Sequence, residues 1–130
     1  FTLVDCTSTH VGDLSPLRTM RQLTTVNCAG TKVQDLSPLA GMPLRWLCLN
    51  ATRVADLNPL RGMPLTFLAC KGTAITDLSP LKEMPELRDL ACDFVPARDS
   101  AVLRSIKTLQ TINDLPVGVF WKRVGAGESP

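Results

Sequence analysis

Asp35-Leu36-Ser37-Pro38-Leu39 is one of four closely similar pentapeptides in this 130-residue chain, and their spacing decides the fold. The other copies, with a degenerate fifth, are Asp13-Leu14-Ser15-Pro16-Leu17, Asp56-Leu57-Asn58-Pro59-Leu60, Asp77-Leu78-Ser79-Pro80-Leu81 and Asp99-Ser100-Ala101-Val102-Leu103. Successive aspartates are 22, 21, 21 and 22 residues apart. A period this regular indicates a repeat protein, in which each unit buries its apolar face against its neighbours.

Apolar residues keep the same period throughout the chain. Three columns are expected to point inward: Phe1, Leu23, Leu44, Leu65, Leu87 and Leu109; Val4, Val26, Leu47, Leu68, Leu90 and Ile112; and Cys6, Cys28, Leu49, Cys70 and Cys92. They read L-x-x-L-x-(L/C), and alternate residues of a strand share one face. The pattern predicts a leucine-rich repeat solenoid of the α/β class.

The predicted solenoid is right-handed, with a curved parallel sheet of about six strands on its concave face. The strands are expected at residues 1–6, 23–28, 44–49, 65–70, 87–92 and 109–113. Short 3₁₀ or helical turns are expected on the convex face, because Ser-Pro starts a helix but few residues precede the next Met. The serine is expected to cap each turn.

Two polar columns are predicted to be structural ladders. In the first, the recurrent aspartates are expected to accept backbone N–H bonds at the bend. In the second, threonine hydroxyls are expected to bond backbone groups of the adjacent repeat. A calcium site is disfavoured because each repeat supplies one carboxylate. The ladder residues are Asp35, Asp56, Asp77, Thr31, Thr52 and Thr73.

The C-terminal end of the chain differs from the repeats. Residues 96–107 are predicted to form a longer helix, with Val102, Leu103 and Ile106 on one face. Residues 116–124 are predicted to form a second helix whose apolar face includes Phe120 and Trp121. We therefore divide the chain into a solenoid at 1–113 and a helical cap and tail at 114–130, since an open solenoid end needs a cover.

The composition argues against some classes of function. A net charge of +2 gives no strong case for nucleic-acid binding, and no apolar run approaches membrane-spanning length. Phe1 already falls in an inward column, so we expect the sequence to be cut from a longer protein or to be processed. No cofactor is indicated.

The sequence offers few residues that could form a catalytic or metal-binding site. His10 is the one histidine and is expected in a surface loop, so no zinc site can be built around a histidine pair. The cysteines follow the repeat spacing and are expected to be free thiols, which favours a reducing compartment such as the cytoplasm. Cys48 alone is expected to point outward and to be reactive.

The outward strand positions are where a partner would bind. Trp46 and Phe67 fall on adjacent strands over small residues, which predicts a shallow apolar patch with a charged rim. Alternatively, the two rings stack on each other to shield the sheet, or they meet a missing domain. The candidate partner-binding residues are Trp46, Phe67, Cys48, Lys71, Asp89, Asn50 and Asp93.

The repeat L-x-x-L-x-(L/C)-x-x-(N/T)-x-(V/I)-x-D-L-S-P-L resembles the 21–22-residue leucine-rich repeats of internalins and protein-phosphatase regulators. The closing segment resembles that of leucine-rich repeat domains in planctomycete-type bacteria, although Asp114-Leu115 replaces the more usual Gly-Lys. This second resemblance rests on Cys92-Asp93-Phe94, Arg98-Asp99, residues 103–113 and Phe120-Trp121-Lys122. Such domains often stand behind a Ser/Thr kinase, so the resemblance implies a recognition or regulatory module.

Two functions therefore remain open. The first is a non-catalytic protein-binding module, part of a larger bacterial and possibly kinase-linked protein, that receives a protein partner on its concave face. The alternative is a structural spacer or self-association element that pairs through the edge strand at residues 1–6.

Overall fold

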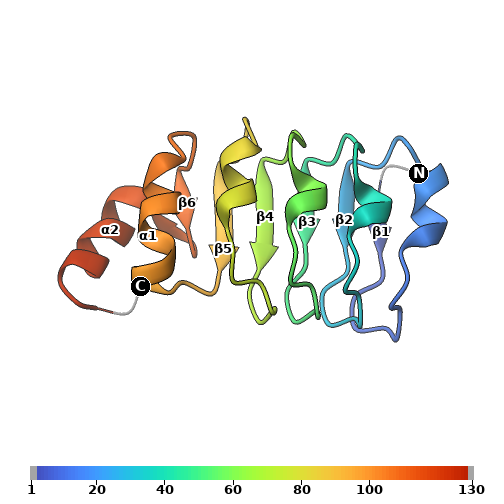
Figure 1. Ribbon diagram of the computed structural model, residues 1–130, viewed down its shortest axis with the longest axis horizontal. Helices are drawn as coiled ribbons and strands as arrows, with labels where there is room; N and C mark the ends of the chain where they lie inside the picture. Colours follow the sequence, from blue (N-terminus) through green and yellow to red (C-terminus); the bar gives the residue numbers. More distant parts are fainter. Residues whose placement is uncertain (1–2, 129–130) are drawn as a thin grey trace.

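The computed structural model describes residues 3–128, which form one row of strands, all parallel except the last (Figure 1). The first five strands are each followed by a short turn or helix. The strands are β1 (Leu3–Asp5), β2 (Thr25–Asn27), β3 (Trp46–Cys48), β4 (Phe67–Cys70), β5 (Asp89–Cys92), β6 (Thr111–Ile112) and β7 (Leu115–Pro116). The 3₁₀ turns are η1 (Ser15–Thr19), η2 (Ser37–Leu39), η3 (Asn58–Leu60) and η4 (Ser79–Glu83). The helices are α1 (Pro96–Ser105) and α2 (Val117–Gly125). The predicted leucine-rich repeat solenoid is confirmed.

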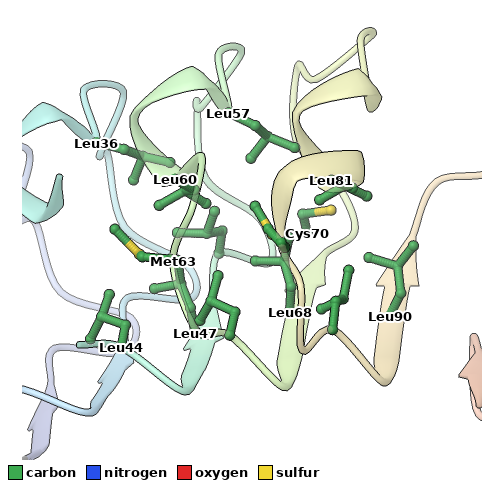
Figure 2. Close-up of a cluster of buried hydrophobic side chains, with 14 of the residues drawn as sticks. Leu36, Leu44, Leu47, Leu57, Leu60, Met63, Leu68, Cys70, Leu81 and Leu90 are labelled. Carbon is green, nitrogen blue, oxygen red and sulfur yellow. The ribbon is translucent and has the colours of Figure 1, made fainter. Parts of the chain in front are cut away.

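The strands pair in chain order, and the pairing keeps the columns of the sequence in register. Val4, Val26, Leu47, Leu68, Leu90 and Ile112 are successive partners along the sheet. From Val26 to Ile112 this column is at most 2% exposed. The leucines of the strands and of the 3₁₀ turns meet between the two layers and form the core (Figure 2).

The repeated aspartate shapes the bend before each 3₁₀ turn. Its carboxylate accepts a hydrogen bond from the N–H two residues later, as from Ser37 to Asp35 over 2.9 Å. The serines make no capping bond, so the predicted serine cap is wrong. The aspartate takes that role because its carboxylate already lies over the first N–H of the turn.

The threonine ladder acts within each repeat, not between repeats as predicted. Thr31 Oγ1 donates to the carbonyl of Cys28 over 2.7 Å, and Thr52 Oγ1 donates to Leu49 over the same distance. Thr73 bonds Cys70 in the same way over 3.0 Å. The chain turns back immediately after each strand, so the carbonyl three residues earlier is closer than the next repeat.

The end of the array is closed by a hairpin and a helix. Strand β7 runs antiparallel to β6, and this strand was not predicted. The turn between them places Asn113 and Asp114 at φ 51° and 67°, which two-residue hairpins favour and Asn and Asp tolerate. The chain then enters α2, which lies beside α1 at the end of the row (Figure 1).

Several predicted boundaries were too long. The strands within residues 3–128 have two to four residues. The first four end early because the chain turns after each of them through a left-handed residue, such as Gly30 (φ 70°) after β2. A Cβ at Gly30 would lie 3.2 Å from Ser8 Oγ. Helix α1 ends at Ser105 instead of residue 107. The predictions for Phe1 lie outside the described residues. No helix between residues 3 and 128 has the length and hydropathy needed to cross a membrane.

Candidate functional site

The sheet face opposite the 3₁₀ turns, which we call the open face, carries a pair of stacked aromatic rings. Trp46 and Phe67 are direct partners on β3 and β4. Their ring centroids are 5.0 Å apart and their planes differ by 6°. Parallel strands in register hold side chains at this separation, so the sheet itself stacks the rings. Both side chains are partly exposed, and together they form a ridge on the open face.

A hollow lies on each side of this aromatic ridge. The first has a volume of about 340 Å³ and is bounded by Trp46 together with Leu3, Asp5, Thr25 and Asn27. The second has a volume of about 490 Å³ and includes Phe67, Asn50, Lys71, Asp89, Thr111 and Asp114 in its lining. The ridge therefore stands between two hollows, and the second one contains the charged side chains of Lys71, Asp89 and Asp114.

Cys48 has the predicted outward position on the sheet, but its side chain is buried. Cys48 occupies the open-face column but is 8% exposed, and its neighbour Ala69 is 3% exposed. These small side chains lie between the aromatic ridge and the residues at the strand ends, which shield them from solvent. Cys48 therefore points to the open face but is covered by its neighbours.

Two of the predicted partner-binding residues form hydrogen bonds with the backbone of adjacent repeats. Asn50 Oδ1 accepts the N–H of Lys71 over 2.8 Å, and Asp93 Oδ2 accepts the N–H of Gly72 over 2.8 Å. Asn113 does the same for Cys92. These side chains bind the ends of the strands together.

The charged residues of the second hollow remain accessible to different degrees. Lys71 is exposed, while Asp89 is partly buried and accepts a hydrogen bond from Thr111 Oγ1 over 2.7 Å. Asp114 lies in the hairpin turn and is exposed. The hollow therefore presents two carboxylates and one ammonium beside the face of Phe67.

Hydrogen bonds stabilise the ionised carboxylates of Asp35 and Asp77. The N–H and the hydroxyl of Ser37 both donate to Asp35, and the resulting stabilisation of the carboxylate lowers the pKa of Asp35. The pKa of Asp77 is lowered chiefly by the N–H of Ser79. Each carboxylate has a local structural role, and no group of three or more metal-ligating side chains occurs within residues 3–128.

All five cysteines are free thiols, and burial suppresses the ionisation of three of them. Desolvation raises the pKa of Cys28 and of Cys92 to about 12, and it raises that of Cys70 further. A thiol is nucleophilic as the thiolate, so these buried groups are inert near neutral pH.

A column that includes two arginines borders the aromatic ridge and was not among the predicted site residues. Arg45 and Arg88 precede Trp46 and Asp89, and the column runs through Thr24, Arg45, Thr66, Arg88 and Gln110. The backbone links its members, since Thr66 donates its N–H to the Arg45 carbonyl and Gln110 donates to Arg88. The repeat period could have identified this column in the sequence, because each of its members stands one residue before a member of the column that contains Trp46 and Phe67.

Two solved structures share this architecture. Internalin C2 from Listeria monocytogenes matches with a TM-score of 0.74 and 28% sequence identity over 86% of this chain. An internalin, inlF, from the same organism matches with a TM-score of 0.53 and 21% identity over 79% of the chain. The chain has an internalin-like leucine-rich repeat fold.

The internalin-like domain spans 50% and 38% of the lengths of those two chains. No known protein-family model matches its sequence, and no curated protein matches it. The likeness to internalins is therefore one of fold and repeat, and the planctomycete and kinase resemblance stays a prediction. Leucine-rich repeat domains are generally protein-binding modules, and the open face is the surface on which the partly exposed aromatic pair of this domain lies.

Proposed function

We propose that this internalin-like domain is a non-catalytic protein-binding module that receives a protein partner on its open face. The observation that carries the proposal is the aromatic ridge of Trp46 and Phe67, partly exposed between two hollows. The inward columns build the core, so these two large rings are not needed to fill it. Partly exposed aromatic side chains are frequent anchors in protein interfaces, where one can contribute about 2 kcal/mol or more.

The geometry suggests how a partner would engage the ridge. An apolar side chain of the partner would enter the hollow beside Trp46, near Leu3 and Thr25. Polar groups of the partner would meet Asp89 and Lys71 across the ridge. Because the rings already stack on each other, binding requires little reordering of side chains, which lowers its entropic cost.

The test removes the ridge while keeping the fold. The doubly substituted Trp46→Ala, Phe67→Ala domain should fold, with a melting temperature lowered by no more than about 10 °C, since an aromatic pair contributes about 0.5–1.5 kcal/mol beyond its burial. It should fail to retain the proteins that the wild-type domain captures from a lysate of the organism that encodes it. Val119→Ala is the matched control, because Val119 is 40% exposed and lies on α2. Unfolding of the double variant, or unchanged capture, would contradict the proposal.

Attachment of the domain to a Ser/Thr kinase is a narrower part of the proposal. Its support is the resemblance of the closing segment, in particular Cys92-Asp93-Phe94 and Phe120-Trp121-Lys122, to planctomycete-type repeat domains. Sequencing the coding region on both sides of this segment tests it directly. A neighbouring kinase domain would support a regulatory role, and a different domain would exclude this form of the proposal.

Self-association is a second candidate, favoured by the first strand. Leu3 is 58% exposed, and β1 pairs with β2 alone among the described strands. An edge strand offers unpaired backbone groups to another chain. Light scattering should then show a mass that rises with concentration and falls to that of a monomer in Leu3→Lys. A constant monomer mass would remove this candidate.

A further inference from the structure

A basic groove lies along the edge of the sheet where the strands begin, outside the ridge and both of its hollows. It has a volume of about 580 Å³, and its lining includes Arg45, Thr66, Glu86, Arg88, Lys107 and Gln110. Three of the lining side chains are cationic and one is anionic. The groove therefore has an excess of positive charge in a chain whose net charge is only +2.

The two arginines stand in one column, two strands apart. Arg45 immediately precedes β3 and Arg88 immediately precedes β5. Thr66 has the equivalent position before β4, which lies between them. Strands lie about 4.8 Å apart, so the two arginine backbones are separated by roughly 10 Å. Arg88 Nη2 donates to Gln110 Oε1 over 3.1 Å, which orients this guanidinium along the edge of the sheet.

Glu86 shows that the groove accepts a carboxylate. Its Oε2 lies 3.2 Å from Arg45 Nη1, although the two residues belong to repeats that are not adjacent. The ion pair therefore crosses the groove over the position of Thr66. Both side chains are more than half exposed, at 60% for Arg45 and 51% for Glu86, so the pair is weak and can be exchanged.

We propose that this groove binds an acidic peptide segment of another protein, whose carboxylates pair with Arg45 and Arg88 and displace Glu86. Guanidinium groups match carboxylates in a planar, bidentate arrangement, and an occupied carboxylate position is present already. Nucleic acid is disfavoured because three cations around one groove do not form the extended basic stripe that follows a phosphate backbone. The proposal goes beyond the open-face function and does not depend on it.

The experiment uses the whole domain and a fluorescently labelled octaglutamate peptide. Fluorescence anisotropy at low salt should show binding that weakens as salt is raised, since exposed charge pairs are screened. Arg45→Ala and Arg88→Ala should each weaken binding about two- to fivefold, the range of partly exposed ion pairs. Glu86→Gln should strengthen binding, because it removes the internal competitor without changing size.

Controls separate this site from general attraction between charges. Arg53→Ala removes one positive charge from the opposite edge of the sheet, where Arg53 is exposed, and should leave the affinity unchanged within about 1.5-fold. The Trp46→Ala, Phe67→Ala variant should also bind octaglutamate normally, so failure of the open-face proposal would not affect this result. Circular dichroism melts establish that each variant is folded.

Three outcomes would overturn the proposal. The first is no binding of octaglutamate by the wild-type domain at low salt. The second is a loss in Arg53→Ala as large as that in Arg45→Ala and Arg88→Ala. The third is a DNA duplex of equal charge that binds more tightly and shows the same arginine dependence, which would assign the groove to nucleic acid.

Discussion

Phe67, Leu68 and Ala69 are consecutive residues of one strand with three different roles. Leu68 points inward and is 0% exposed, because it belongs to the column that the repeats stack. Ala69 points to the open face yet is 3% exposed, because larger neighbours surround it. Phe67 lies on the same face as Ala69 and keeps part of its ring accessible. The alternation of a strand assigns the face, and the size of the neighbours decides the exposure.

Leu68→Ala should lower the free energy of unfolding by roughly 2–5 kcal/mol, because it removes a fully buried side chain and leaves a cavity. Thr25→Ala on the open face is the comparison and should cost less than about 1 kcal/mol. Denaturant titration followed by circular dichroism measures both. A loss below about 1 kcal/mol for Leu68→Ala would mean that this column is not packed as described.

Alkaline pH should destabilise the domain through its buried thiols. Burial raises the pKa of Cys28 and Cys92 from an ordinary 9.0 to about 12, so between these values they ionise only in the unfolded chain. Stability is thus complete below pH 9 and falls as the pH rises toward 12, by about 1.4 kcal/mol per pH unit for each thiol. Denaturant titrations with reducing agent at pH 7.5 and 10.5 test this. The Cys28→Ala, Cys92→Ala variant should show a smaller fall, and an equal fall would exclude these thiols as its source.

At the scale of elements, α1 and α2 close the end of the array with an aromatic cluster. Phe94 packs edge-on against Phe120 and Trp121, with ring centroids 4.9 and 5.9 Å apart. The guanidinium of Arg104 lies 4.0 Å from the Trp121 ring centre, which ties the two helices together. Asp99 is 1% exposed, accepts the Val95 N–H over 2.9 Å and pairs with Arg98, so the start of α1 is also anchored.

Removing residues 116–130 should destabilise the array from this end. The deletion takes away Phe120, which is 0% exposed, and uncovers β6, which α2 contacts. Hydrogen exchange should then show loss of protection in β6 first and β5 next, with β2 and β3 little changed. Deleting only residues 127–130 is the control, since it leaves both helices whole. Equal protection in the full and shortened chains would show that the segment is not a cap.

At the scale of the whole molecule, each repeat contacts chiefly its neighbours, so position along the row decides how much a buried residue contributes. Val4 and Val26 show this most directly, since they are partners in one column. Val26, with a strand on each side, is 0% exposed, whereas Val4 on β1 has one neighbouring strand among those described and is partly exposed.

Val26→Ala should therefore cost about 1.5–3 kcal/mol and Val4→Ala clearly less, although the chemical change is identical. Denaturant titration of the two variants in parallel measures the difference. Equal losses would mean that β1 is as well covered as β2, as it would be in a self-associated form. Repeating the measurement over a range of protein concentrations separates that case.

The 21- to 22-residue period determined the fold, the inward columns, the number of repeats and the position of the aromatic ridge. It could do so because a solenoid places equivalent residues of successive repeats side by side, so register in the sequence becomes contact in space. Tertiary structure alone decided that Cys48 is buried, that Thr31 bonds its own turn, that Asn50 and Asp93 hold neighbouring backbones, and that Arg45 reaches Glu86 across an intervening repeat. These contacts depend on the size and length of neighbouring side chains. A repeat pattern specifies which residues are neighbours, but it does not specify which of their atoms come into contact.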